Sequence, residues 1–444
     1  MGPELPAEAA DLAREASSVG ARRIDPTAMV RRGRRPAPAA GATSAAPPAA
    51  RMLVQARRAQ VGVPESPRPA MAHAQRRGTA KRRALQRGGG SAETEAAVLA
   101  GLRYLKSIQR RNGSWGRNHR HNKYGDFRVG KTALCLLAFL GSGHTHQENG
   151  EFQETVRRGL DWLISQQDRP TGHFGDSSAY GHGISTYAFA EAYAMTRDPR
   201  LRGPLRRAVG RVVTAQMTSR ERKLDGGWPY YYRDPDRRHD RFPRMSVSVW
   251  QVMALKSARI GGINVPETSL QRAKRFVLAA HDPRLHAFRY NHDPEWLSTS
   301  YPTLPGTTPA ALFALQLLGG DRTGEEYQTG LRYIGRRPLM TRWRRYSDEE
   351  FATRGLSNLY YYYYATLALF FEGGDAWKQW NSRLTRLLVG GQDRDGSWRP
   401  VSYYAEYARD TDRDRVYTTA MSVLMLEVYY RYFTPLLTSM EKSK

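Results

Sequence analysis

An aromatic residue recurs at a nearly constant interval along most of this 444-residue chain. The successive intervals are 59, 54, 60, 55 and 55 residues. The six positions are Trp115, Phe174, Trp228, Phe288, Trp343 and Trp398. The first and the last close the same turn, residues 109–115 and 392–398, and both turns read Q-x-x-x-G-x-W. Self-similarity at a fixed period is the signature of a repeat architecture, so we expect six copies of one supersecondary unit.

Each copy has a helical segment on either side of its aromatic turn. The first is amphipathic, since the segments that begin at Gly101, Gly159 and Gly330 place apolar residues at positions i, i+3 and i+4. The second is apolar on nearly all faces, at residues 132–140, 184–195, 246–258, 308–318, 359–371 and 418–432. A helix of that composition must be covered on most sides. Closing six pairs into a ring, with the apolar helices inside, meets that demand and predicts an all-α (α/α)6 toroid over residues 92–437, followed by a tail at 438–444.

Residues 1–91 differ from the rest in composition, because they are rich in Ala, Pro and Arg and poor in aromatic residues. Such a segment buries too little apolar area to offset its chain entropy, so we expect a disordered basic arm ahead of the toroid. The arm carries 17 Lys and Arg against 6 Asp and Glu, which is +11 of the formal net charge of +27. No basic stripe with interleaved stacking aromatics marks any one element, and this disfavours nucleic-acid binding.

Several other classes are excluded or disfavoured by composition. A single cysteine, Cys135, rules out a disulfide-stapled scaffold and a cysteine-rich zinc module. No apolar run approaches the roughly 18 residues of a membrane span. No apolar region follows the first charges, so no secretory signal is predicted. We therefore expect a cytoplasmic protein, for which peripheral contact with a membrane surface stays open.

The two complete turns resemble the QW repeats of the terpenoid cyclase and protein prenyltransferase superfamily, also called prenyltransferase and squalene oxidase repeats. The resemblance covers residues 93–435 and suits a single-toroid member of bacterial type. It implies an (α/α)6 toroid whose central cavity holds isoprenoid chains. Because the same residues return at the same place in the repeat, Gln109, Trp115, Gln392 and Trp398 are expected to serve packing rather than chemistry.

The resemblance does not carry over a complete catalytic motif. Squalene-hopene-type cyclases protonate an alkene with an aspartate of a D-x-D-D-T-A motif, and the nearest approach here is Asp412 and Asp414, interleaved with arginines ahead of an inner helix. Prenyltransferase β-subunits hold zinc with an Asp, a Cys two residues later and a distant His, but Ala133 stands two residues before Cys135. No cofactor or metal is therefore expected. Whether the protein is an enzyme stays open, and a cyclase-like isomerase or lyase is favoured over a zinc prenyltransferase.

Aromatic side chains on the inner helices are the positive indication of a ligand. Tyr187, Trp250, Phe313 and Tyr361 could line an apolar chamber for an isoprenoid, or they could only fill the middle of the ring, and both interpretations stay open. Glu191 and Glu427 lie in the same helices. A buried carboxylate needs a partner, so both are candidate site residues if they face inward.

Two further functions remain open from the sequence. One is a non-catalytic scaffold whose ring binds a protein partner. The other is a carbohydrate-active (α/α)6 barrel, which would need two carboxylates roughly 5 to 10 Å apart in the central cavity.

Overall fold

The computed structural model describes residues 73–116, 127–175, 178–232, 241–298, 301–402 and 414–431. The chain divides into two compact units, one of residues 1–65 and 294–300 and the other of residues 66–293 and 301–444. In the first unit the described residues form the short helix α12 (Pro294–Leu297). The second unit contains the six repeats. No helix of the described residues is long and apolar enough to cross a membrane.

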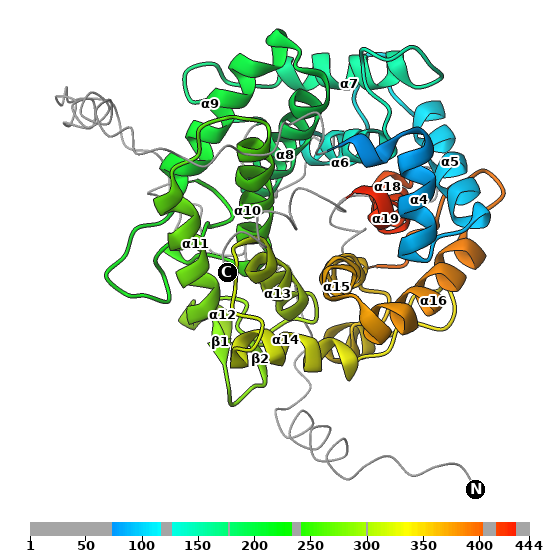
Figure 1. Ribbon diagram of the computed structural model, residues 1–444. Coiled ribbons are helices and arrows are strands. Elements are labelled where there is room, and N and C mark those ends of the chain that lie inside the picture. The colour runs from blue at the N-terminus through cyan, green and yellow to red at the C-terminus, as the bar shows by residue number, and fades with distance from the viewer. Residues whose placement is uncertain are drawn as a thin grey trace, which may run out of the picture. The chain divides into compact units, whose positions relative to one another are not determined.

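Six apolar helices stand side by side and form the inner wall of a ring (Figure 1). They are α6 (Arg128–Gly141), α8 (Ala179–Thr196), α10 (Met245–Ile260), α13 (Thr307–Leu317), α15 (Leu359–Glu372) and α18 (Val416–Leu426), the last prolonged by α19 (Val428–Arg431). Each contacts the next along the chain, and α18 contacts α6, so the ring is closed. Most of their residues are buried, as a helix that is apolar on all faces requires. The predicted (α/α)6 toroid is confirmed.

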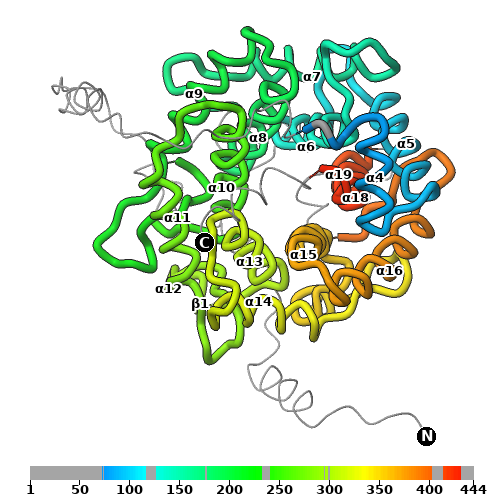
Figure 2. The backbone as a smooth tube through the Cα atoms, in the orientation of Figure 1, coloured from blue at the N-terminus to red at the C-terminus, as the bar shows by residue number. Residues whose placement is uncertain are grey.

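Figure 2 shows the amphipathic helices outside this wall. They are α5 (Ala92–Ser107), α7 (Gln153–Ser165), α9 (Pro199–Ala215), α11 (Glu267–Ala279), α14 (Glu325–Gly335) and α16 (Gly374–Gly391). Helix α9 packs on α8 and α10, and α11 packs on α10 and α13. Helix α5 contacts both α18 and α6 and so covers the place where the sixth repeat meets the first, which we call the closing junction.

Short elements occupy some of the connections. Strands β1 (His281–Asp282) and β2 (Ala287–Phe288) form an antiparallel pair in the fourth turn. A π-helical turn, η4 (Glu350–Arg354), precedes α15. A 3-10 turn, η2 (Ala74–Arg76), and helix α4 (Gly78–Gly88) precede the first repeat.

The glutamine of the turn links one repeat to the next. The Nε2 atom of Gln109 donates to the carbonyls of Gly113 in its own turn and of Thr155 in the next outer helix, both at 2.9 Å. Gln392 repeats this arrangement, with 2.9 Å to Gly396 and 2.9 Å to Ala97 in α5. Since α5 belongs to the first repeat, the last glutamine bonds across the closing junction.

The aromatic anchors are held on both sides by hydrogen bonds. Trp115, Trp228 and Trp398 are fully buried, and their indole N–H groups donate to main-chain carbonyls of the preceding outer helix at 2.7 to 2.8 Å. The backbone N–H of five anchors donates to a polar side chain near the start of the following inner helix, namely Thr132, His182, Ser248, Thr308 and Thr419. The repeated aromatic residue is thus a fixed junction between the two helical layers.

The fifth repeat departs from the predicted spacing. Its anchor position is held by Met340, whose backbone N–H donates to the Tyr362 hydroxyl at 3.0 Å. Trp343 is only half-buried, and its ring lies against Gly391 of α16. The prediction of Trp343 as the fifth anchor is therefore wrong. Met340 occupies the buried anchor position, and Trp343 matches the aromatic spacing only because it lies three residues later.

The boundary of the predicted N-terminal arm is also corrected. Residues 74–76 and 78–88 form η2 and α4, whereas the whole of residues 1–91 was expected to be disordered. Arg76, Ala84 and Gly88 in these turns are buried. Composition misses this segment because its order depends on contacts with residues far along the chain, and residues 1–72 lie outside the described part.

The turn glycine at position 396 yields a stability prediction. Gly396 has φ +87°, and a Cβ there would overlap the carbonyl oxygen of Ala100 in α5. We expect Gly396→Ala to lower the free energy of unfolding by about 2 kcal/mol or more, through left-handed strain together with this overlap. Gly319 has φ +66° with nothing within 4 Å of a Cβ, so Gly319→Ala should cost only the strain, about 1 kcal/mol. Urea unfolding followed by circular dichroism compares the two, and equal losses would contradict the role given to the Ala100 contact.

Candidate functional site

Three layers of side chains follow the interior of the ring from one end to the other. The inner helices place them at intervals of about four or seven residues, because such residues share one helix face. In α8 they are Tyr180, Tyr187 and Glu191. The first layer is a hydroxyl-bearing rim at the N-terminal ends of the inner helices, the second is aromatic, and the third is charged.

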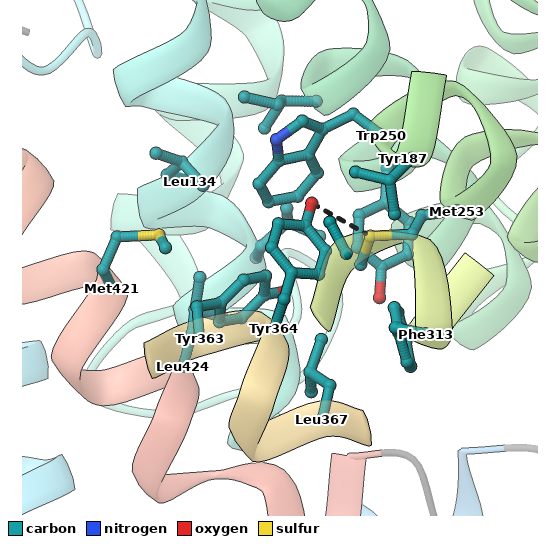
Figure 3. Packing of buried hydrophobic residues seen from close by; sticks show 14 of the residues in the cluster. Leu134, Tyr187, Trp250, Met253, Phe313, Tyr363, Tyr364, Leu367, Met421 and Leu424 are labelled. Atoms are coloured by element: carbon teal, nitrogen blue, oxygen red, sulfur yellow. Dashed lines mark hydrogen bonds between the residues drawn. The ribbon is translucent and has the colours of Figure 1, made fainter. Parts of the chain in front are cut away.

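The aromatic layer is packed across the ring. The Trp250 ring stacks on Tyr363, with centroids 5.7 Å apart, and also meets Tyr364 at 5.9 Å. Phe313 lies 6.1 Å from the Tyr364 ring. Figure 3 shows these side chains together with Tyr187, and all are buried. Helices α10 and α15 are not neighbours in the inner wall, so their side chains meet across its interior.

The structure therefore brings three of the four predicted aromatic site residues together. Tyr187, Trp250 and Phe313 belong to this layer, and each is at most 3% exposed. Tyr364 of α15 also links this layer to α10, since its hydroxyl donates to the Met253 sulfur at 3.7 Å. Side chains fill the space around these rings, and ligand binding by them remains a prediction.

Tyr361 does not share this layer. Its ring meets Trp380 of the outer helix α16 edge-on at 6.1 Å, and its hydroxyl donates to the Arg337 carbonyl at 3.4 Å. Consecutive residues of a helix are about 100° apart, so Tyr361 lies about 200° around the helix from Tyr363, whose ring stacks on Trp250 inside the ring. Five consecutive tyrosines concealed this difference in the sequence, and the prediction of Tyr361 as a residue of the central cavity is wrong.

A tyrosine rim lies at the N-terminal ends of α8, α10 and α15, formed by Tyr180, Tyr230, Ser246, Tyr290 and Tyr360. Tyr180, Ser246 and Tyr360 are the second residues of their helices. The Tyr180 hydroxyl donates to the Ser246 hydroxyl, which donates to the Tyr290 hydroxyl at 3.3 Å. The Tyr290 hydroxyl pairs with that of Tyr230, and the Tyr360 hydroxyl donates to the Ser246 carbonyl at 2.6 Å. One polar network thus joins three inner helices.

Burial favours the protonated form of the Tyr230 and Tyr360 hydroxyls. Burial raises the pKa of Tyr230 and of Tyr360 well above the ordinary tyrosine value, and neighbouring tyrosines add to both shifts. Arg244, which is fully buried, forms a 2.8 Å ion pair with Asp293, and its guanidinium lies 5.6 Å from the Tyr230 ring centroid. The rim can therefore donate hydrogen bonds and offer aromatic faces at neutral pH.

Sequence reasoning missed Tyr230 and Tyr290. A usable signal was present, since each stands two residues after an anchor, Trp228 and Phe288 respectively. The repeat register therefore marks this position as the start of the rim, although nothing in the local sequence places two such tyrosines from separate turns in contact.

The charged layer holds Glu191, which was predicted to need a partner if buried. Its Oε2 atom lies 3.0 Å from Arg76 and 3.3 Å from Arg431. Burial alone would raise the pKa of Glu191, but the two guanidinium groups outweigh it and lower the pKa to about 2. Arg431 also lies 5.5 Å from the Tyr187 ring centroid, so this layer adjoins the aromatic one.

Glu427 shows the opposite behaviour. It is fully buried, and burial raises its pKa well above the ordinary value, although Arg431 counteracts the shift. The guanidinium of Arg431 lies 3.9 Å from the carboxylate. Gly141 makes room for the carboxyl group, since a Cβ there would overlap its oxygen. The two predicted glutamates thus share one arginine, but their pKa values are shifted in opposite directions.

Of the two predicted catalytic aspartates, Asp414 lies among the described residues. Asp412 lies outside the described residues. Asp414 is buried just ahead of α18, close to Tyr104 of the outer helix α5. Burial raises the pKa of Tyr104, and the carboxylates of Asp395 and Asp414 add to the shift. Catalysis by either aspartate remains a prediction. Among the described residues, no group of three or more His, Cys, Asp or Glu side chains could hold a metal ion.

Comparison with known proteins supports the architecture at low sequence identity. No protein-family model and no curated protein matches the chain. An inactive variant of the α-1,6-mannanase GH76A of Salegentibacter sp. HEL1_6, solved with α-1,6-mannotriose, is 12% identical at a TM-score of 0.53 and covers 76% of this chain and 99% of its own. A variant of the type II terpene cyclase MstE from Scytonema, solved with geranylgeranyl dihydroxybenzoate, is 14% identical at a TM-score of 0.53 and covers 76% and 97%. The chain is an (α/α)6 toroid. At this identity the likeness concerns the fold and not the activity.

Proposed function

We propose that this toroid binds an isoprenoid or comparable apolar molecule with a polar head group at the tyrosine rim. The observation that carries the proposal is the meeting of rim hydroxyls from α8, α10 and α15 directly above an aromatic layer. Tyrosine faces suit an apolar chain, and protonated hydroxyls suit a polar head. The terpene cyclase neighbour was solved with geranylgeranyl dihydroxybenzoate, a ligand that combines both features.

The rim is favoured over the aromatic layer because the two differ in packing. Tyr180, Tyr230 and Tyr360 are half-buried, whereas Trp250, Phe313 and Tyr364 are almost fully enclosed by other side chains. Binding among the enclosed rings would require them to move apart, at the cost of their mutual contacts. A cyclase-like isomerisation would in addition need an acid, for which Asp412 and Asp414 remain the predicted groups.

Retention of geranylgeraniol by the purified protein tests this proposal, with squalene and α-1,6-mannotriose as comparison probes. We expect geranylgeraniol to be retained in native mass spectrometry. Tyr360→Phe should weaken its binding about five- to tenfold, because one hydroxyl of the network is lost. Tyr361→Phe changes the adjacent residue, whose ring faces the outer helices, and should leave binding unchanged.

Two outcomes would contradict the proposal. The proposal is wrong if the protein retains neither geranylgeraniol nor squalene. It is also wrong if Tyr360→Phe and Tyr361→Phe lose the same affinity. Binding of mannotriose alone would favour the carbohydrate-active alternative. Binding of none of the three would favour a non-catalytic scaffold, which the filled aromatic layer also suits.

A further inference from the structure

Arg76 reaches the ring from a segment that belongs to none of the six repeats. Its side chain is 1% exposed. The Nη1 atom donates to the Leu140 carbonyl at 3.1 Å and to the Glu191 carboxylate at 3.0 Å. The Nη2 atom donates to the Arg431 carbonyl at 3.2 Å. A single guanidinium thus serves three oxygen acceptors that are far apart in sequence, and its Nη1 atom also donates to the Met195 sulfur at 3.4 Å.

These acceptors come from the repeats on either side of the closing junction. Leu140 lies in the last turn of α6 in the first repeat, and Glu191 lies in α8 in the second. Arg431 ends α19 in the sixth repeat, and its own guanidinium donates to the Leu137 carbonyl of α6 at 3.1 Å and lies 3.3 Å from Glu191. The two arginines and one carboxylate therefore connect the sixth repeat to the first two.

The residues after Arg76, up to Gly89, also contact helices at the closing junction. Arg77 donates to the Gly143 carbonyl, just after α6, at 3.2 Å. Helix α4 packs on α19. At the other end, Trp377 and Asn381 of α16 donate to the carbonyls of Gly88 and Gly89 at 2.9 and 2.8 Å. The segment thus runs from the end of the first inner helix to the last outer helix.

Close packing leaves little freedom along this path. A Cβ on Gly88 would lie 2.7 Å from the Tyr429 ring, and Gly90 has the same ring at 2.9 Å. Tyr429 in turn donates its hydroxyl to Asn381 at 2.8 Å. The glycines that end α4 allow the chain to lie directly on α19, so this run of glycines serves packing and is not a flexible spacer.

We propose that residues 73–90 form a clasp segment, which holds the ring closed at the junction between its sixth and first repeats. All other junctions in the ring are formed by covalently consecutive repeats, whereas this one joins the two ends of the repeat array. Without Arg76, the carbonyls of Leu140 and Arg431 lose a buried donor, and Glu191 keeps only one of its two cations. Release of the clasp segment would loosen the ends of α6 and α19 at this junction without unfolding any repeat.

Hydrogen exchange of the full chain tests the clasp segment. Arg76→Met keeps an unbranched apolar stem but removes every donor. We expect amide exchange at the ends of α6 and α19, residues 137–141 and 428–431, to accelerate about tenfold or more, because charged buried hydrogen bonds are lost there. Exchange in α10 and α13, on the far side of the ring, should stay unchanged. Arg82→Met in α4 is the matched control, since Arg82 is exposed and its guanidinium donates to the Thr79 hydroxyl of the same helix.

The outcomes separate a local role from a general one. Unchanged exchange at residues 137–141 and 428–431, or equal acceleration around the whole ring, would overturn the proposal. If Arg76→Met does not fold, Arg76→Lys gives the answer, because an ammonium group keeps the charge but cannot reproduce the guanidinium fork. It should accelerate exchange in the same two segments to a smaller degree, and exchange identical to wild type would overturn the proposal equally.

Discussion

Replacing Trp398 by alanine is expected to lower the free energy of unfolding by about 3 to 5 kcal/mol, the cost of removing a fully buried tryptophan. Its side chain is 0% exposed, and its indole N–H donates to the Leu388 carbonyl at 2.8 Å. It also fills the space beside Gly101 of α5, where a Cβ would lie 3.1 Å from the ring. The loss therefore falls on the closing junction as well as on the sixth repeat. Urea unfolding followed by far-ultraviolet circular dichroism measures it.

Trp343→Ala is the matched control for this experiment. Trp343 matches the aromatic period equally well, but its side chain is half-buried and lies against the outer helix α16. We expect a loss of only about 1 kcal/mol, as for a partly exposed residue outside the core. If both tryptophans cost the same, the assignment of Met340 as the fifth anchor is wrong.

The second large effect concerns Glu191 and its dependence on pH. Its folded pKa is about 2, below the ordinary value of 4.5, so ionised Glu191 stabilises the native state above pH 4.5. This stabilisation, about 3 kcal/mol for a shift of this size, is lost as the pH falls toward 2. Glu191→Gln removes it. The deficit of the variant relative to wild type should therefore be largest at pH 7 and should shrink between pH 5 and pH 2.

Glu427→Gln should give the opposite sign. The folded pKa of Glu427 is raised, so the unfolded chain releases this proton near pH 4.5 while the native chain retains it. Wild-type stability contributed by this group falls as the pH rises above 4.5. The glutamine variant does not have this dependence, so it should gain relative to wild type between pH 4 and pH 7. Urea midpoints of both variants across that range provide the check, and deficits that change in the same direction would refute the contrast drawn between the two carboxyl groups.

Much of the architecture follows from local pattern repeated along the chain. An amphipathic helix, an aromatic turn and an apolar helix together make up one repeat unit. The same pattern recurs along the sequence, so each copy supports the assignment of the others. Gln109 and Trp115 act as predicted, in packing and backbone hydrogen bonding. A ring follows because six helices that are apolar on all faces must cover one another.

Which residues face the interior was decided by tertiary structure. Tyr361 and Tyr364 are equivalent by composition, yet one meets Trp380 outside and the other meets Trp250 inside. Tyr230 and Tyr290 reach one rim from turns that are 60 residues apart. Helical rotation and the register between repeats determine these contacts, and neither is encoded in a short stretch of sequence.

The sequence by itself determined the repeat, the two helical layers and the closed toroid, because all three follow from local sequence patterns that recur several times along the chain. Only the tertiary structure decided that Met340 replaces an aromatic anchor, that the aromatic layer is packed, and that Arg76 joins Glu191 and Arg431 at the closing junction. The physical reason is the distance along the chain: Arg76 and the Arg431 carbonyl are separated by 355 residues, and the order of such a segment depends on partners that its own composition does not reveal.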